Sequence, residues 1–152
     1  MTLSTLDGWK ETTMTSELAS RGSLFVNMSK GVVRSIGVFV GLHGIAHLVG
    51  TSGAFQAADK GEVEEYLGGF WEISDPALLR TVGVVWAVLA VAFLVAAGFM
   101  WRNDRRWPSV LGYTAAASLI FTVIGLVPAV FGVVINLGLF AFARVAVPSR
   151  SG

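Results

Sequence analysis

Two long uncharged stretches constrain this chain more than any other feature of its sequence. Residues Thr81–Met100 and Ser109–Ala143 contain no Asp, Glu, Lys or Arg. A helix needs about 20 apolar residues to cross a hydrocarbon core of roughly 30 Å. The first stretch therefore predicts one membrane span. The second would measure roughly 52 Å as a single helix, which is too long for one crossing and predicts a hairpin of two spans.

The overall composition points to the same class of protein. Hydrophobic residues make up 54% of the sequence and charged residues only 14%, whereas soluble domains carry about 25% charge. This composition excludes an intrinsically disordered chain, which combines low hydrophobicity with high net charge. Cysteine is absent, so disulfides, iron–sulfur clusters and zinc–thiolate sites are excluded as well. A net charge of +1 gives no reason to expect a nucleic-acid partner.

We predict an all-α fold, a four-helix transmembrane bundle. The expected spans cover about residues 31–50, 77–101, 109–126 and 129–145. They form a membrane domain of residues 31–147, between a polar N-terminal segment of residues 1–30 and a C-terminal tail of residues 148–152. Glycine and proline near Pro128 place a tight hairpin turn at Val127–Ala129.

The connection of residues 51–76 holds most of the acidic residues and is expected outside the membrane. Its segment GEVEEYLGGFW predicts a short amphipathic helix, interrupted by Gly68-Gly69, with aromatic residues suited to the membrane interface. After it, Ser74-Asp75-Pro76 indicates a helix start, because a side-chain oxygen can cap the first turn and proline suits its first position.

For residues 1–30 we expect a mobile or surface-lying cytoplasmic tail, the alternative being a short interfacial helix around Thr15–Met28. The first span competes with a signal peptide cleaved near Ser52-Gly53-Ala54. Two histidines in its apolar region and the polar leader before it favour a retained helix.

Lysine and arginine counts predict the orientation. With the N-terminus inside, nine of these residues lie on the cytoplasmic side, and only Lys60 and Arg80 lie outside. Positively charged residues stay on the cytoplasmic side, so both termini are expected there. An odd number of spans would put Arg144 and Arg150 outside, which independently supports the hairpin.

His43 and His47 are the only histidines, and both lie in the first span. Their spacing puts them on one edge of a helix, and ionisable residues in a span normally face the bundle interior. They are candidates for a shared metal ion, an axial haem or chlorophyll ligand, or a proton relay or quinone contact. Alternatively, both rings bond to neighbouring helices and tie the bundle together. We predict no metal site, because the nearest carboxylates are confined to the outer loop.

Uncharged polar side chains from all four expected helices gather at similar depths. Counting 1.5 Å per residue from the outer ends of the spans places both His43 and Asn136 about 10 Å below the outer surface. We therefore predict a polar pocket in the outer half of the bundle, where these two side chains face one another directly or through one water or ligand. The candidate ligand-binding residues are His43, His47, Trp86, Ser118, Thr122 and Asn136.

Three segments, LHGIAHLVG, GVVWAVLAVAFLVAAGFMW and VFGVVINLGLF, resemble a group of small bacterial four-span proteins. That group has H-G-x-x-H-L-x-G in the first helix, G-x-x-W in the second and G-x-x-x-N in the fourth. In span count and topology the chain also looks like the DoxX-like proteins, membrane subunits associated with quinone-linked redox complexes. The resemblance implies a multi-pass protein of the bacterial inner membrane and supplies no catalytic residue. The matching positions are His43, Gly44, His47, Leu48, Gly50, Gly83, Trp86, Gly132 and Asn136.

These patterns predict a small integral membrane protein without autonomous catalysis, acting as a subunit or as a small-ligand-binding module. One alternative is a quinone- or haem-associated subunit of a redox complex. Another is an oligomeric transporter. We expect no cofactor under the first prediction, and quinone or haem under its redox alternative. The expected partners are the lipid bilayer and either a larger membrane complex or further copies of the chain.

Overall fold

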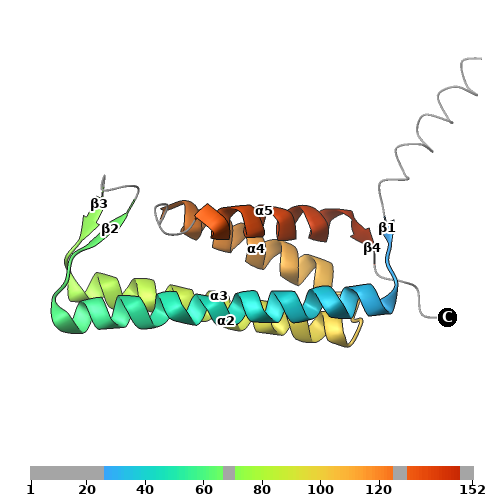
Figure 1. The fold of residues 1–152 in the computed structure, drawn as a ribbon, viewed down its shortest axis with the longest axis horizontal. Helices are drawn as coiled ribbons and strands as arrows, with labels where there is room; N and C mark the ends of the chain where they lie inside the picture. Colours follow the sequence, from blue (N-terminus) through green and yellow to red (C-terminus); the bar gives the residue numbers. More distant parts are fainter. Residues whose placement is uncertain (1–25, 67–70, 125–129, 148–152) are drawn as a thin grey trace, which may run out of the picture.

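The computed structural model describes residues 26–66, 71–124 and 130–147, and within them the chain is mainly helical (Figure 1). Two of its helices, α2 and α3, are long and apolar enough to cross a membrane, by length and composition. Those two helices extend beyond α4 and α5 at one end of the molecule (Figure 1). The four described helices are α2 (Lys30–Lys60), α3 (Pro76–Trp101), α4 (Trp107–Ile124) and α5 (Val130–Val145).

Helices α2 and α3 pack as a close antiparallel pair. A Cβ atom built on Gly37 would lie 3.1 Å from Met100 Cβ, and one built on Gly44 would lie 2.9 Å from Phe93 Cβ. Later residues of α2 therefore contact earlier residues of α3, so the two helices run antiparallel. Glycine at these positions lets the two backbones approach closely, as is common between apolar helices.

Helices α4 and α5 form a second antiparallel pair. Gly132 lies against Thr122, Asn136 bonds to Ser118, and Gly112 faces Ala143. The prediction that the uncharged stretch after Ser109 folds back on itself as two helices is confirmed. The predicted turn at Val127–Ala129 lies outside the described residues.

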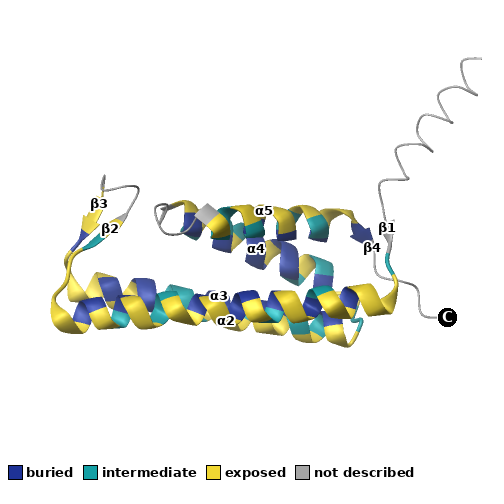
Figure 2. Ribbon diagram, viewed as in Figure 1, coloured by how far each residue is buried: buried dark blue, intermediate teal, exposed yellow. Residues whose placement is uncertain are grey.

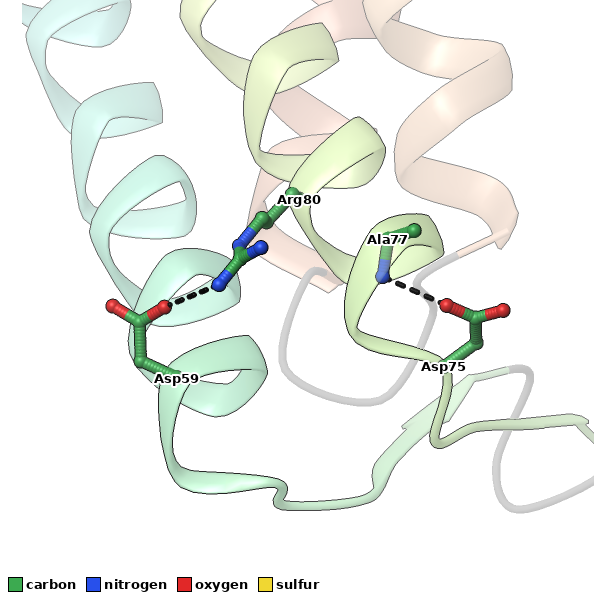
Figure 3. A network of polar contacts seen from close by, with 4 residues as sticks. All are labelled: Asp59, Asp75, Ala77 and Arg80. Atoms are coloured by element: carbon green, nitrogen blue, oxygen red, sulfur yellow. Dashed lines mark hydrogen bonds and ion pairs between the residues drawn. The ribbon is translucent and has the colours of Figure 1, made fainter.

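The helix-start signal at Ser74-Asp75-Pro76 is confirmed, and Asp75 is the cap. Its Oδ1 atom accepts a hydrogen bond from the backbone N–H group of Ala77 at 2.7 Å (Figure 3). It accepts a second from the backbone N–H group of Leu78 at 3.3 Å. Pro76 occupies the first turn, where its missing N–H has no intrahelical partner to lose.

Helix α2 runs past the predicted first span of residues 31–50 and ends only at Lys60. Ala57 and its helical neighbours on the added turns pack against Leu79 and Val82 of α3. Arg80 also reaches back to Asp59, with its Nη2 atom 3.0 Å from Oδ1 (Figure 3). The helix stops at Gly61, whose backbone φ of 67° is a left-handed conformation that glycine adopts readily.

The predicted amphipathic helix within residues 61–71 is wrong. Strands β2 (Glu64–Tyr66) and β3 (Trp71–Ile73) pair antiparallel, with Glu64 opposite Ile73 and Tyr66 opposite Trp71. Aromatic and β-branched residues at these positions suit a strand, and Ile73 is buried against the α2–α3 pair. Gly68-Gly69, between the strands, lies outside the described residues.

Among the described residues, the chain enters α2 and leaves α5 at the same end of the molecule. Strand β1 (Val26–Asn27) pairs in parallel with β4 (Ala146–Val147). An interfacial helix over Thr15–Met28 is therefore wrong at Val26–Asn27, and most of that segment, with the rest of the predicted tail, lies outside the described residues.

Charged side chains of the described residues gather at the two ends of the helices. We call the end near the start of α2 the basic end and the end near the strands β2 and β3 the acidic end (Figure 1). The basic end carries Lys30, Arg34, Arg102, Arg105, Arg106 and Arg144, with one acidic residue, Asp104. The acidic end carries Asp59, Glu62, Glu64, Glu65, Glu72 and Asp75, with the basic residues Lys60 and Arg80.

Two apolar clusters fill the interior. The cluster toward the basic end contains Phe93, Met100, Trp107 and Leu111, all fully buried. The cluster toward the acidic end is built from small residues of α2 packed on Leu79 and Val82 of α3 and on Ile73. The outward faces of the helices carry many exposed apolar residues (Figure 2).

Replacing Gly44 by alanine is expected to lower the melting temperature, because the new methyl would lie 2.9 Å from Phe93 Cβ and 3.0 Å from the Ala90 carbonyl oxygen. Overpacking of this kind costs about 1–3 kcal/mol. Gly98→Ala is the matched control, since nothing lies within 4 Å of a Cβ at that position. Thermal melts followed by circular dichroism in detergent compare the two variants. Equal melting temperatures would contradict the close packing of α2 on α3.

Candidate functional site

The six predicted ligand-binding residues come together at one level of the bundle, between the two apolar clusters. Five of them are buried: Ser118 and Asn136 are fully so, and His43 retains the largest exposed fraction, 9%. The histidines come from α2, Ser118 and Thr122 from α4, and Asn136 from α5. Trp86 of α3 is half-buried beside them. We call this set the polar cluster.

Four side chains of the polar cluster form a closed ring of hydrogen bonds. His43 Nε2 lies 3.1 Å from Asn136 Oδ1, so the prediction that these two residues face one another is confirmed, and the contact is direct. Asn136 Nδ2 donates to Ser118 Oγ at 2.9 Å, and Ser118 Oγ lies 2.9 Å from His47 Nε2. His47 Nδ1 lies 3.0 Å from the carbonyl oxygen of His43. The ring therefore returns to α2 after passing through α5 and α4.

For neutral imidazoles, the chemistry of the acceptors sets the direction of each bond in this ring. A carbonyl oxygen only accepts, so His47 Nδ1 carries a hydrogen. In a neutral imidazole the other nitrogen is then an acceptor, and it takes the hydroxyl hydrogen of Ser118. The amide oxygen of Asn136 also only accepts, so His43 Nε2 carries the hydrogen. With both imidazoles neutral, all four bonds point the same way around the ring.

Thr122 fixes the orientation of the Asn136 amide. Its hydroxyl donates to the Ser118 carbonyl oxygen, so the group that approaches the hydroxyl oxygen must be a donor. Asn136 Nδ2 lies 3.2 Å from Thr122 Oγ1 and fills that role. Both N–H groups and the oxygen of the amide thus have partners, which removes the cost of burying them.

Aromatic rings surround the two imidazoles. The ring centroids of His47 and Trp86 lie 5.0 Å apart, and those of His43 and Phe93 lie 4.9 Å apart, both edge to face. Phe121 of α4 packs against Trp86 in turn, at 5.1 Å. Our reading of the sequence missed Phe93 and Phe121. A signal for Phe93 existed in Gly44, since a glycine between the two histidines indicates that a neighbouring helix approaches there.

The polar cluster lies nearer the middle of α2 than the sequence suggested. The predicted depth was counted from Gly50, but α2 has no charged side chain between Arg34 and Asp59. At 1.5 Å per residue His43 is roughly 14 Å from Arg34, and His47 is roughly midway between the two charges. The cluster therefore lies near the centre of the uncharged part of α2.

One imidazole nitrogen of the polar cluster takes no part in the ring. Among residues 26–66, 71–124 and 130–147, His43 Nδ1 has no hydrogen-bond partner, and in the neutral tautomer it is an acceptor. Within the same residues no group of three or more metal-ligating side chains comes together. The cluster can hold three helices in register and can accept one further hydrogen bond. A ligand pocket at this place stays a prediction.

We compared the chain with family models, curated proteins and solved structures. No family model matches it, and neither a curated protein nor a solved structure does. The interpretation of the site therefore depends on its geometry alone.

Replacing His43 and Asn136 by leucine, singly and together, is expected to reveal a coupling free energy of about 0.6–1.7 kcal/mol, the range for polar contacts between apolar helices in membranes. The measurement is the free energy of unfolding in mixed micelles. The control pairs His43→Leu with Thr81→Val, because the Thr81 hydroxyl bonds within its own helix, to the Ala77 carbonyl oxygen at 2.9 Å. That pair should be additive. Additivity of the first pair as well would contradict the His43–Asn136 bond.

Proposed function

We propose that the chain is a small four-span protein of a bacterial inner membrane, without catalysis of its own, that serves as a subunit of a membrane assembly. The observation that carries this proposal is the closed hydrogen-bond ring. In this ring the buried polar side chains hydrogen-bond to one another. A catalytic site would leave such groups free to bind a substrate. A role in holding the bundle is what the ring supports best.

The exposed surface supports the membrane placement. Leu42, Val88, Ile120 and Phe131 have exposed fractions of 60%, 61%, 67% and 83%, and each lies on a different helix. Water-soluble monomers rarely expose large apolar patches, so large exposed apolar side chains on all four described helices favour a surface that faces lipid. In a bilayer the same side chains contact lipid, and the helices satisfy their own backbone groups.

The charge asymmetry supports an orientation with both termini in the cytoplasm. The basic end gathers six Lys and Arg side chains against one acidic residue, and the acidic end has the reverse balance. Because Lys and Arg remain on the cytoplasmic side of bacterial membrane proteins, we place the basic end there.

A small-ligand-binding role is the second candidate, and His43 Nδ1 favours it. A ligand hydroxyl, such as that of a quinol, has a ready acceptor in this nitrogen, next to the rings of Phe93 and His47. The likeness to DoxX-like subunits points the same way. Axial haem ligation fits less well, because three of the four imidazole nitrogens already bond within the ring. A transporter role would require several copies of the bundle.

Single cysteines test the membrane placement, because the natural sequence has none. A cysteine at exposed Glu65 of the acidic end should react with a membrane-impermeant maleimide on intact cells, and one at exposed Arg105 should react only after lysis. Reaction at Arg105 alone would invert the orientation. Reaction of both in a chain that alkaline washing removes from membranes would overturn the membrane placement.

Solvent extraction of the purified protein separates the two functions. We expect no visible haem absorption band and no stoichiometric quinone in the extract, since the ring leaves only one nitrogen free. A quinone recovered at one per chain from the wild type and from Thr81→Val, but lost from His43→Leu, would replace the structural role with the redox alternative.

A further inference from the structure

A groove lies between α4 and α5 near the basic end, away from the polar cluster. Its volume is about 540 Å³, which falls within the range of small-molecule sites. It is lined by Pro108, Ser109, Gly112, Tyr113, Ala116, Phe140, Ala143 and Arg144.

Small side chains create this groove. Gly112 and Ala143 meet at the point where α4 and α5 approach closely, since a Cβ on Gly112 would lie 3.6 Å from Ala143 Cβ. Tyr113 and Phe140 stand beside that contact, and Tyr113 is 80% exposed. The result is a concave apolar surface that opens on the outside of the bundle.

One cation marks the end of the groove. The guanidinium carbon of Arg144 lies 5.7 Å from the centroid of the Phe140 ring, one helical turn earlier, so the charge stays beside the groove. Within the parts of the chain that the structure describes, no carboxylate forms an ion pair with Arg144. Its charge is thus available to an anion from outside.

We propose that this groove binds an anionic phospholipid, with an acyl chain along the Gly112–Ala116 face and the phosphate at Arg144. The proposal rests on the membrane placement proposed above, in which the basic end faces the cytoplasmic leaflet. That leaflet holds anionic lipids, and each Lys or Arg near its surface adds to their binding. The groove joins an apolar channel to one cation, which matches the two parts of a phospholipid.

A second copy of the chain fits this surface less well. In a symmetric dimer the same patch faces itself, so a contact centred on the groove would bring the two Arg144 side chains together. The repulsion of like charges in an apolar surrounding opposes such a contact, and a phosphate relieves it.

Native mass spectrometry of the full chain in detergent tests the proposal. The probes are phosphatidylglycerol and phosphatidylcholine with identical acyl chains. We expect one phosphatidylglycerol per chain to be retained in preference to phosphatidylcholine. Arg144→Gln should weaken this retention about fivefold, which corresponds to the roughly 1 kcal/mol of one basic residue near an anionic surface. Arg105→Gln removes the same charge at the same end, outside the groove, and should retain the lipid.

A second pair of variants tests the apolar part. Ala116→Phe fills the groove and should reduce retention of both lipids. Ala117→Phe adds the same ring at the next, exposed position, outside the lining, and should not. Equal losses in Arg144→Gln and Arg105→Gln, equal retention of the two lipids, or a retained second chain in place of lipid would each overturn the proposal.

Failure of the lipid site and failure of the membrane placement give different results. If the chain resists alkaline extraction from membranes but shows no lipid preference dependent on Arg144, only the lipid site is wrong. If the chain is absent from the membrane fraction, the membrane placement itself is wrong.

Discussion

The need to pair polar side chains inside an uncharged interior governs how the two helix pairs meet. Each pair is held by close backbone contact, at Gly44 for α2 and α3 and at Gly112 for α4 and α5. The ring formed by His43, Asn136, Ser118 and His47 joins one pair to the other. Leaving any of these groups unpaired in an apolar setting costs free energy, so the α4–α5 pair is constrained to the position in which all of them bond.

Much of this arrangement could be predicted from the sequence, because the distribution of charged residues sets the bounds of whole helices and the residue count sets the depth of each side chain. The absence of charge predicted α3, and the length of the second uncharged stretch predicted α4 and α5. Equal depth paired His43 with Asn136 although α2 runs past the predicted span. Helix α2 simply continues beyond the shorter α4–α5 pair (Figure 1).

Other features depend on contacts between distant residues, which local patterns do not show. Hydropathy falls after Gly50, yet helix α2 continues because Ala57 and Ala58 find Leu79 and Val82 on the antiparallel helix. The β2–β3 hairpin exists where Ile73 can be buried, and the pairing of β1 with β4 joins segments from opposite ends of the chain. The direct bond between His43 and Asn136 depends on a helix spacing that the sequence does not give.

The ring supplies specificity of register more than stability. Polar contacts between membrane helices average only about 0.6 kcal/mol, whereas apolar burial is non-directional and tolerates sliding. If α5 slid by one turn, about 5.4 Å, apolar side chains would still face apolar ones. Asn136, however, would lose its hydrogen bonds to His43, Ser118 and Thr122 at the same time. Because hydrogen bonds weaken steeply with distance and angle, one register satisfies all of them. A bundle whose outer faces are largely apolar needs such a device, since its surface does little to distinguish one register from the next.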